Sequence, residues 1–262
     1  VPGDFTLGLL DHVDEHPSIN WVGTANELGA GYAADGYARM NGVGVVCSTF
    51  GVGELSAINA VAGSYAEHVP VLHLVGAPTE AVQAAGQATH HSLGDGDFTH
   101  MLRMSAEVTV AHEMLQHGTA TAQIDRVLAA MVAEGRPGYL SLPADVAEQS
   151  CEPPTTVLEV PAARTDVDQL ARFADAATQL IADRSPVVLA DIFVHRSGAV
   201  DQLHHLLKVG GLRYASLLWG RRVVDEFRIQ LIDADTPQGT VSFTGANIDT
   251  GTGAITVANA YS

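Results

Sequence analysis

Basic residues are scarce in this chain. Its 262 residues include 13 Lys and Arg against 30 Asp and Glu, which gives a formal net charge of −17. Lys208 is the sole lysine. A surface this acidic repels phosphate backbones and anionic lipid headgroups. The sequence therefore predicts no nucleic-acid partner and no binding to a membrane.

Long hydrophobic runs and cysteines are also rare. No stretch of about 18 apolar residues occurs, so we expect no membrane span. The two cysteines, Cys47 and Cys151, are far apart and have no CxxC partner. We interpret them as free thiols in a reducing cytoplasm. A content of 47% hydrophobic and 16% charged residues indicates a globular protein with a substantial core.

Short apolar runs alternate with helical patterns over the first 150 residues. An apolar helical stretch covers 5–13, and a long polar loop is expected over 79–97. The predicted strands are 19–22, 43–48, 69–75, 108–110 and 138–142, and the predicted helices are 25–39, 54–67 and 119–134. This alternation predicts an α/β fold, a parallel sheet flanked by helices. Ligands of such sheets bind at the carboxyl ends of the strands, where the loops at 24–27, 49–53 and 76–97 should lie.

The rest of the chain is organised differently. Residues 151–165 contain three prolines and no periodicity, which is typical of a linker. Residues 166–226 predict an incomplete second α/β unit, with helices at 166–183 and 198–209 and strands at 186–190 and 212–217. The tail, 227–262, changes character, and its predicted strands at 240–244 and 254–257 are separated by turn residues.

Two acidic residues have simple local explanations. Thr24-Ala25-Asn26-Glu27 has the form of a capping box, with Thr24 as the N-cap and Glu27 at the third helical position. Spacing alone favours this role over a catalytic one. Asp4 precedes an apolar helical stretch and fits an ordinary N-cap aspartate.

Adjacent histidines, His90 and His91, stand in the long loop. No carboxylate or Cys lies at a familiar metal-ligand spacing, so we predict no metal site in this chain. The pair is either solvated or suited to acid–base work near neutral pH. Gly51-Val52-Gly53 is a glycine-rich turn between a strand and a helix, but it matches neither GxGxxG nor the P-loop. Close backbone approach to a ligand and a tight turn without a ligand both explain it.

The order and wording of several segments resemble one family. They resemble the pyruvate, indolepyruvate and branched-chain keto-acid decarboxylase group of thiamine-diphosphate enzymes. The matching segments are Val-Pro-Gly-Asp-Phe (1–5), Ala-Asn-Glu-Leu (25–28), Tyr-Ala-Ala-Asp-Gly-Tyr-Ala-Arg (32–39), Thr-Phe-Gly-Val-Gly-Glu-Leu-Ser-Ala (49–57), Gly-Ser-Tyr-Ala-Glu-His (63–68) and His-His-Ser-Leu-Gly-Asp-Gly-Asp-Phe (90–98). The resemblance implies a pyrimidine-binding domain over 1–150 and part of a middle domain over 166–226, and it leaves the tail from residue 227 unmatched.

Roles for particular residues follow from this resemblance. The glutamate at the position of Glu27 hydrogen-bonds N1′ of the cofactor's aminopyrimidine and so promotes deprotonation of the thiazolium C2. Asp4, His90 and His91 correspond to the acid–base cluster beside the cofactor, where Asp4 and His91 also meet the substrate. Thr49 and Val52 fall in the loop that lies against the pyrimidine.

The resemblance also implies an activity and an assembly. The expected reaction is non-oxidative decarboxylation of a 2-keto acid to an aldehyde and CO₂. The related acetohydroxyacid synthase and oxidase branches usually lack the histidine pair, so a decarboxylase is favoured over a carboligase. Active sites of the family lie between two subunits, which implies a homodimer or homotetramer.

One part of the family pattern is missing. A third domain of the family supplies Mg²⁺, the diphosphate site and a further catalytic glutamate. Gly94-Asp95-Gly96 imitates the magnesium motif, but the next asparagine is Asn247, so we expect only a turn there. We therefore expect the chain to be a fragment of the full enzyme. The alternatives are a truncated, non-catalytic dimerisation domain and a thiamine-diphosphate carboligase.

Overall fold

A computed structural model describes most of the chain, and contacts divide it into two compact units, Val1–Arg164 and Thr165–Ser262. The described residues are 1–152, 154–160, 165–182, 184–216, 220 and 223–224, with the backbone of Asn247–Asp249 and Ala254–Thr256. Parts of the predicted linker, residues 153 and 161–164, lie outside this range. No described helix combines the length and apolar character needed to cross a bilayer.

The first unit contains a four-stranded parallel sheet. Its strands are β1 (Gly44–Thr49), β2 (Val71–Ala77), β4 (Gly138–Pro143) and β3 (Ala111–Met114), in that spatial order. The last residues pair across the sheet, Thr49 with Gly76 and Ala77 with Pro143. The strands thus end together at one edge, and the predicted α/β fold with a parallel sheet flanked by helices is confirmed.

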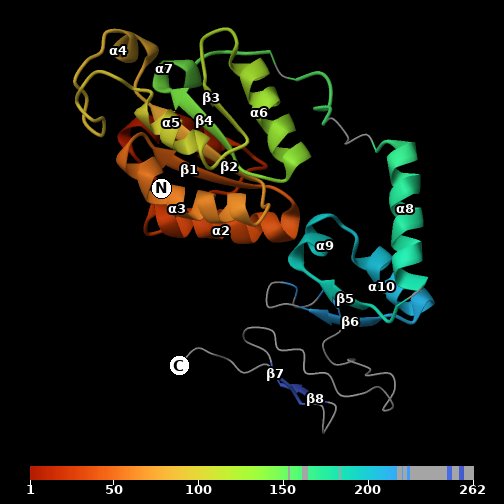
Figure 1. The fold of residues 1–262 in the computed structure, drawn as a ribbon. Coiled ribbons are helices and arrows are strands. Elements are labelled where there is room, and N and C mark those ends of the chain that lie inside the picture. Colours follow the sequence, from red (N-terminus) through yellow and green to blue (C-terminus); the bar gives the residue numbers. More distant parts are fainter. Residues whose placement is uncertain are drawn as a thin grey trace. The chain divides into compact units, whose positions relative to one another are not determined.

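Helices cover both faces of this sheet. They are η1 (Asp4–Thr6), α1 (Leu7–Glu15), α2 (Glu27–Asn41), α3 (Val52–Ala66), α4 (Glu80–Ala84), α5 (His100–Ala106), α6 (Ala120–Glu134) and α7 (Ala144–Ala147). Helices α2 and α3 lie side by side against β1, while α6 packs on β3 and β4 (Figure 1). Val75 of β2 packs with Phe50 and Phe98, whereas Leu72 packs with Val127 of α6. Burial on both faces explains why β2 is apolar almost throughout.

Three local predictions differ from the structure. The predicted strand at 19–22 is wrong: these residues pair with no described strand, and the Val22 side chain is 75% exposed. An apolar run favours burial, but a strand also needs a neighbouring backbone to form a ladder. The strand predicted at 108–110 begins instead at Ala111, because its partner β4 begins at Gly138. The predicted loop at 79–97 contains α4, which Thr79 caps.

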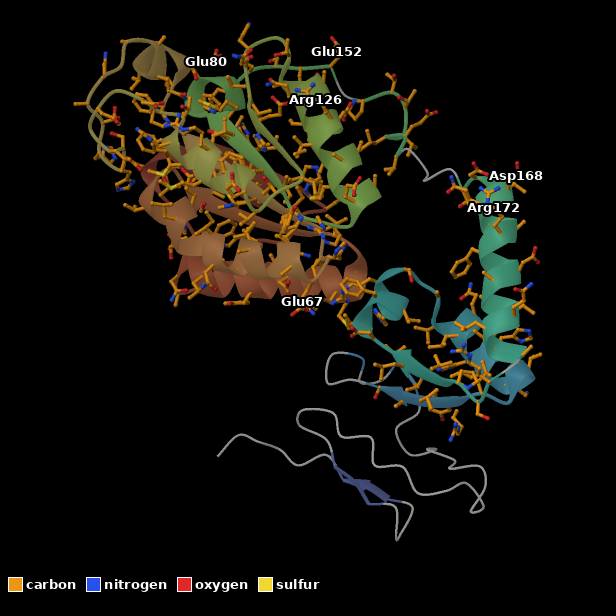
Figure 2. All side chains as sticks on the ribbon, in the orientation of Figure 1. Glu67, Glu80, Arg126, Glu152, Asp168 and Arg172 are labelled. Carbon is orange, nitrogen blue, oxygen red and sulfur yellow. The ribbon has the colours of Figure 1, made fainter. Side chains whose placement is uncertain are left out.

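The second unit holds a two-stranded parallel sheet, β5 (Val187–Ala190) and β6 (Arg213–Ser216). Its helices are α8 (Val167–Ala182), α9 (Ile192–Arg196) and α10 (Val200–Gly210). The small core contains Ala190 and Leu207. No described side chain of α8 is buried, and Figure 2 shows Asp168 and Arg172 projecting from its beginning. The described part of this unit combines parallel strands with helices, as an α/β unit does.

The tail contains one described strand pair, β7 (Asn247–Asp249) and β8 (Ala254–Thr256), which is antiparallel. The second strand falls within the prediction for 254–257. The strand predicted at 240–244 lies outside the described residues.

Candidate active site

The site begins at the carboxyl end of β1, where Thr49 is the last strand residue. Thr49 is buried, and its hydroxyl Oγ1 has no hydrogen-bond partner among the described residues. The backbone of Gly3 lies directly against it, because a Cβ at Gly3 would come within 2.4 Å of the Thr49 Cβ. Buried polar groups are nearly always hydrogen-bonded, so this unsatisfied hydroxyl needs an explanation, and a polar ligand or a water molecule would supply one.

Glu27 begins helix α2. Asn26 is the N-cap, and its Oδ1 accepts a hydrogen bond from the Gly29 amide at 2.7 Å. The predicted capping box is therefore wrong: Thr24 instead donates its hydroxyl to the Asn26 carbonyl at 2.9 Å. Asparagine caps a helix at least as well as threonine, and Asn26 stands next to the first helical residue. The Glu27 carboxylate is left without a capping role, and no described residue hydrogen-bonds to it.

Gly53 of α3 lies between Glu27 and Thr49. A Cβ at Gly53 would lie 2.9 Å from Thr49 Cγ2 and 3.4 Å from Glu27 Oε1. Val52, the residue before it, is 56% exposed at the start of α3. The structure thus brings Glu27, Thr49 and Val52 together from two helices and a strand.

Asp4, His90 and His91 form a second group. The Asp4 carboxylate hydrogen-bonds to Nε2 of His90, and the Phe5 ring stacks on His90 with centroids 5.1 Å apart. The two histidine rings meet edge to face with centroids 4.6 Å apart. Asp4 is not an N-cap, as its local sequence suggested, because Gly3 caps η1 and Asp4 is its first residue.

Gly51 joins these two groups. It has a φ of +65°, and a Cβ there would lie 1.8 Å from the His91 carbonyl oxygen. His91 also has a positive φ, +66°, and its Nδ1 is buried without a described hydrogen-bond partner. The glycine-rich turn therefore approaches the protein's own loop closely, and this contact fixes His91 beside the end of β1.

Glu54 is a buried acidic group that the sequence analysis did not single out. Its Oε1 accepts from the Gly51 amide and its Oε2 accepts from the Tyr139 hydroxyl, both at 2.7 Å. Burial raises the pKa of Glu54 to about 7, although both hydrogen bonds lower it. Burial and the Glu54 carboxylate raise the pKa of Tyr139 well above its usual value. A charged residue three positions after a strand-to-helix glycine was the available sequence signal.

His73 is buried near this pair. Its Nε2 lies 2.8 Å from the Ser48 hydroxyl, and its ring meets Tyr139 edge to face. Burial lowers the pKa of His73 to about 4. The imidazole is therefore neutral at physiological pH and belongs to the core.

Gly94-Asp95-Gly96 forms a turn, as expected. Both glycines have positive φ, +78° and +82°. The Asp95 carboxylate accepts from the Asp97 amide at 3.1 Å and lies 2.7 Å from Nε2 of His100.

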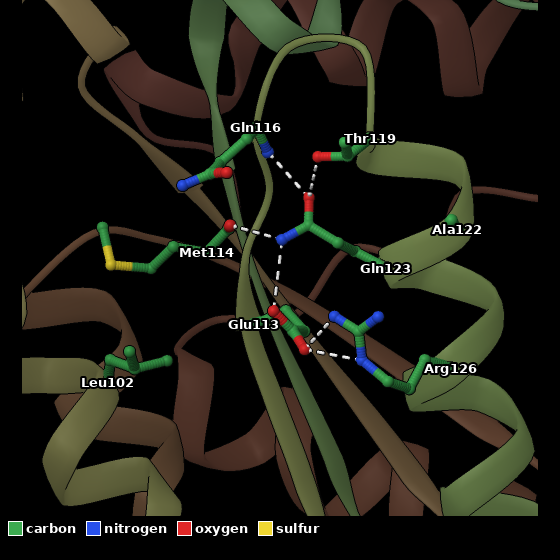
Figure 3. A pocket seen from close by; sticks show the side chains of 8 residues that line it. All are labelled: Leu102, Glu113, Met114, Gln116, Thr119, Ala122, Gln123 and Arg126. Atoms are coloured by element: carbon green, nitrogen blue, oxygen red, sulfur yellow. Dashed lines mark hydrogen bonds and ion pairs between the residues drawn. The ribbon is translucent and has the colours of Figure 1, made fainter.

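A separate cavity of about 570 Å³ lies among α5, β3 and α6 (Figure 3). Gln123 at its wall donates to Glu113 and to the Met114 carbonyl, and it accepts from the Gln116 amide and Thr119. Arg126 also pairs with Glu113. Protein partners already satisfy the Gln123 amide, and no predicted site residue lines this cavity.

Comparison with known proteins finds related sequences. Residues 1–101 match the family described as thiamine pyrophosphate enzyme, N-terminal TPP binding domain. The chain is 53% identical over 226 residues to the alpha-keto-acid decarboxylases of Mycobacterium leprae (strain TN) and Mycobacterium tuberculosis (strain ATCC 25618 / H37Rv). It is 50% identical to that of Mycobacterium avium (strain 104).

These matches cover 86% of this chain but 40% of each relative, so the chain spans well under half the length of the relatives it matches. The fold and the sequence similarity agree with each other. Residues 1–101 belong to the N-terminal TPP-binding domain of thiamine pyrophosphate enzymes, and the chain as a whole is similar to alpha-keto-acid decarboxylases.

Proposed function

We propose that this chain supplies the aminopyrimidine side of an active site that decarboxylates a 2-keto acid to an aldehyde and CO₂. The observation that carries the proposal is the Glu27 carboxylate. It has no described hydrogen-bond partner, and it lies against Gly53 beside the unsatisfied hydroxyl of Thr49. A carboxylate held in place with no structural partner is available to a ligand.

The residues present suit an aminopyrimidine. Glu27 offers a carboxylate that can hold or release a proton at N1′, and Thr49 offers a hydroxyl that can donate or accept. The absence of a side chain at Gly53 lets its backbone pack closely against both groups. When bound, thiamine diphosphate supplies the electron sink for cleavage of the carbon–carbon bond.

Asp4, His90 and His91 would act on the substrate side. The hydrogen bond between Asp4 and His90 orients the imidazole and links the two groups for proton transfer. Asp4 and His91 would contact the keto acid, and the cluster would protonate the product carbon before the aldehyde leaves. The close packing of Gly51 against the His91 backbone supports this role, because acid–base groups must be held in position.

We also propose a homo-oligomer that completes this site. Leu28, Tyr32, Val52 and Leu55 are exposed apolar residues on α2 and α3, the two helices that carry Glu27 and Gly53. The Tyr32 hydroxyl is tied to Asn59 at 2.7 Å, which connects the two helices. Exposed apolar side chains beside a site are typical of a surface that a partner subunit covers. Mg²⁺ in a further domain and a cytoplasmic location stay predictions.

The decisive variant is Glu27→Gln, which keeps the shape of the side chain and removes its proton chemistry. Aldehyde formation should be measured with a panel of 2-keto acids in the full-length natural polypeptide that contains this sequence. We expect a loss of at least 100-fold, on the order of one general acid–base group. Thiamine-diphosphate binding should be measured in parallel by calorimetry.

Asn26→Ala is the matched control, because it damages the start of the same helix and keeps the carboxylate. It should retain most of the activity at a temperature where the protein stays folded. Near-normal turnover by Glu27→Gln would refute the proposal. Acetolactate from pyruvate without aldehyde would instead identify a carboligase.

A further inference from the structure

We propose that Asp4, His90 and His91 bind a transition-metal dication of the Zn²⁺ type. Each residue offers one ligand atom, and these atoms all lie within 4.8 Å of one another. Among the described residues, no other group of three His, Cys, Asp or Glu side chains meets this condition. The spacing of these residues in the sequence did not indicate a metal site, because Asp4 is 86 positions from His90.

The donor set selects the class of ion. Two imidazoles and one carboxylate are ligands that Zn²⁺ commonly uses, with a fourth position left for water. Mg²⁺ prefers an all-oxygen shell with several waters, so it should not compete here. The Asp4 and His90 side chains are 45% and 60% exposed, which leaves a path for the ion.

Neighbouring residues position the ligands in advance. The Phe5 ring stacks on His90, and it meets His91 edge to face at 6.3 Å between centroids. Gly51 packs closely against the backbone carbonyl of His91. Ligands that are already held in place lose less conformational entropy when the ion binds.

His91 provides a second, independent observation. Its Nδ1 is buried, and no described residue hydrogen-bonds to it. This nitrogen is one of the two ring atoms of His91 that can serve as the metal ligand. One consequence rests on the proposed function: an ion at these three residues would occupy the acid–base cluster and inhibit decarboxylation. The binding itself does not depend on that function.

Zn²⁺ binding can be measured by titrating the metal-free 262-residue chain in a calorimeter, with Mg²⁺ as a comparison ion. We expect one saturable Zn²⁺ site and no saturable heat with Mg²⁺. Loss of an outer-shell partner costs roughly 10–100-fold in metal affinity. Loss of a direct ligand in His91→Ala or Asp4→Asn should therefore weaken binding at least 10-fold.

The double variant Asp95→Asn/His100→Ala is the matched control. It removes another Asp–His pair, 2.7 Å apart, that has no third ligand meeting the same condition. It should bind Zn²⁺ like the parent chain, as should Glu27→Gln, which separates this test from that of the proposed function. Circular dichroism checks folding, and the exposed His90→Gln replaces any ligand variant that does not fold. No saturable binding up to millimolar Zn²⁺, or unchanged affinity in the folded ligand variants, would overturn the proposal.

Discussion

The starts of α2 and α3 each carry a glutamate in the first helical turn, and the two glutamates differ in every contact. Glu54 is buried and accepts from the Gly51 amide and the Tyr139 hydroxyl. Glu27 is partly exposed and has no described hydrogen-bond partner. The comparison shows that partners, rather than residue type or place in the helix, separate a structural carboxyl group from one available to a ligand.

The comparison also qualifies a common inference. Strongly shifted pKa values often mark functional sites, but structural networks shift them too. Here the raised pKa belongs to Glu54, whose two carboxylate oxygens already accept hydrogen bonds from protein groups. The candidate catalytic residue is Glu27, whose carboxylate oxygens have no hydrogen-bond partner among the described residues.

The largest expected effect is that of Gly51→Ala at the start of α3. The new Cβ would lie 1.8 Å from the His91 carbonyl oxygen in a residue with positive φ, so the backbone must shift. Strain of about 1–3 kcal/mol from the backbone alone, with the clash added, should lower the free energy of unfolding by about 3 kcal/mol or more. Urea denaturation followed by circular dichroism measures this.

Gly36→Ala in α2 is the control for that substitution. Nothing lies within 4 Å of a Cβ there, so alanine should raise the free energy of unfolding by roughly 0.5–1 kcal/mol. Equal unfolding midpoints for the two alanine variants would show that the contact between Gly51 and His91 is not rigid.

The next effect is the pH dependence of Glu54→Gln. The folded-state pKa of Glu54 is about 7, above the usual value of 4.5. Between these values the folded state holds the proton more tightly, so this group's contribution is full below 4.5 and is lost as the pH rises through 7. Glutamine cannot ionise, so the Glu54→Gln variant does not lose this stability as the pH rises. The stability of the variant relative to the parent should therefore rise by up to about 3 kcal/mol between pH 4.5 and pH 8.

The pH dependence that His73 gives to the stability has the opposite sign. It is the same in the parent and in Glu54→Gln, so it cancels when the two stabilities are subtracted. Its lowered pKa makes the parent chain more stable as the pH rises from about 4 to 6.5, but both proteins contain it. Urea midpoints measured across this range provide the test. A difference that does not change with pH would mean that Glu54 stays ionised in the folded state.

The smallest effects come from the start of α2. Asn26→Ala removes the hydrogen bond to the Gly29 amide and should cost about 1 kcal/mol of stability. Glu27→Gln removes only a favourable charge near the helix start, worth about 0.5 kcal/mol. Thermal unfolding of both variants ranks them. A larger loss for Glu27→Gln than for Asn26→Ala would restore the capping role that the sequence suggested.

The sequence predicted the strands and helices better than the contacts at their ends. The helix at 119–134 is α6 almost to the residue, because its amphipathic pattern reports one buried face. The prediction of a capping box at Thr24 was wrong because Thr24 and Asn26, two positions apart, are both residue types that can cap a helix. Which of the two caps α2 depends on where the helix begins in the packed structure, and the periodicity of the sequence does not indicate that position.

The candidate site shows the same limit. Resemblance to the family named Asp4, Glu27, His90 and His91, but no spacing rule linked Asp4 to the histidines. Their contacts cross between elements that are distant in the chain, such as the hydrogen bond between His90 and Asp4. The unsatisfied groups, Thr49 Oγ1 and His91 Nδ1, can be recognised only when all their neighbours are known.

By itself, the sequence determined an acidic α/β protein with a parallel sheet and the family that it resembles. Alternating apolar runs and short motifs are local properties, so they can be recognised without coordinates. The tertiary structure decided which polar groups are satisfied and which remain available. It did so because parallel strands end at one edge and bring separate loops together there. Among the described residues, Glu27 has no hydrogen-bond partner there and Glu54 has two.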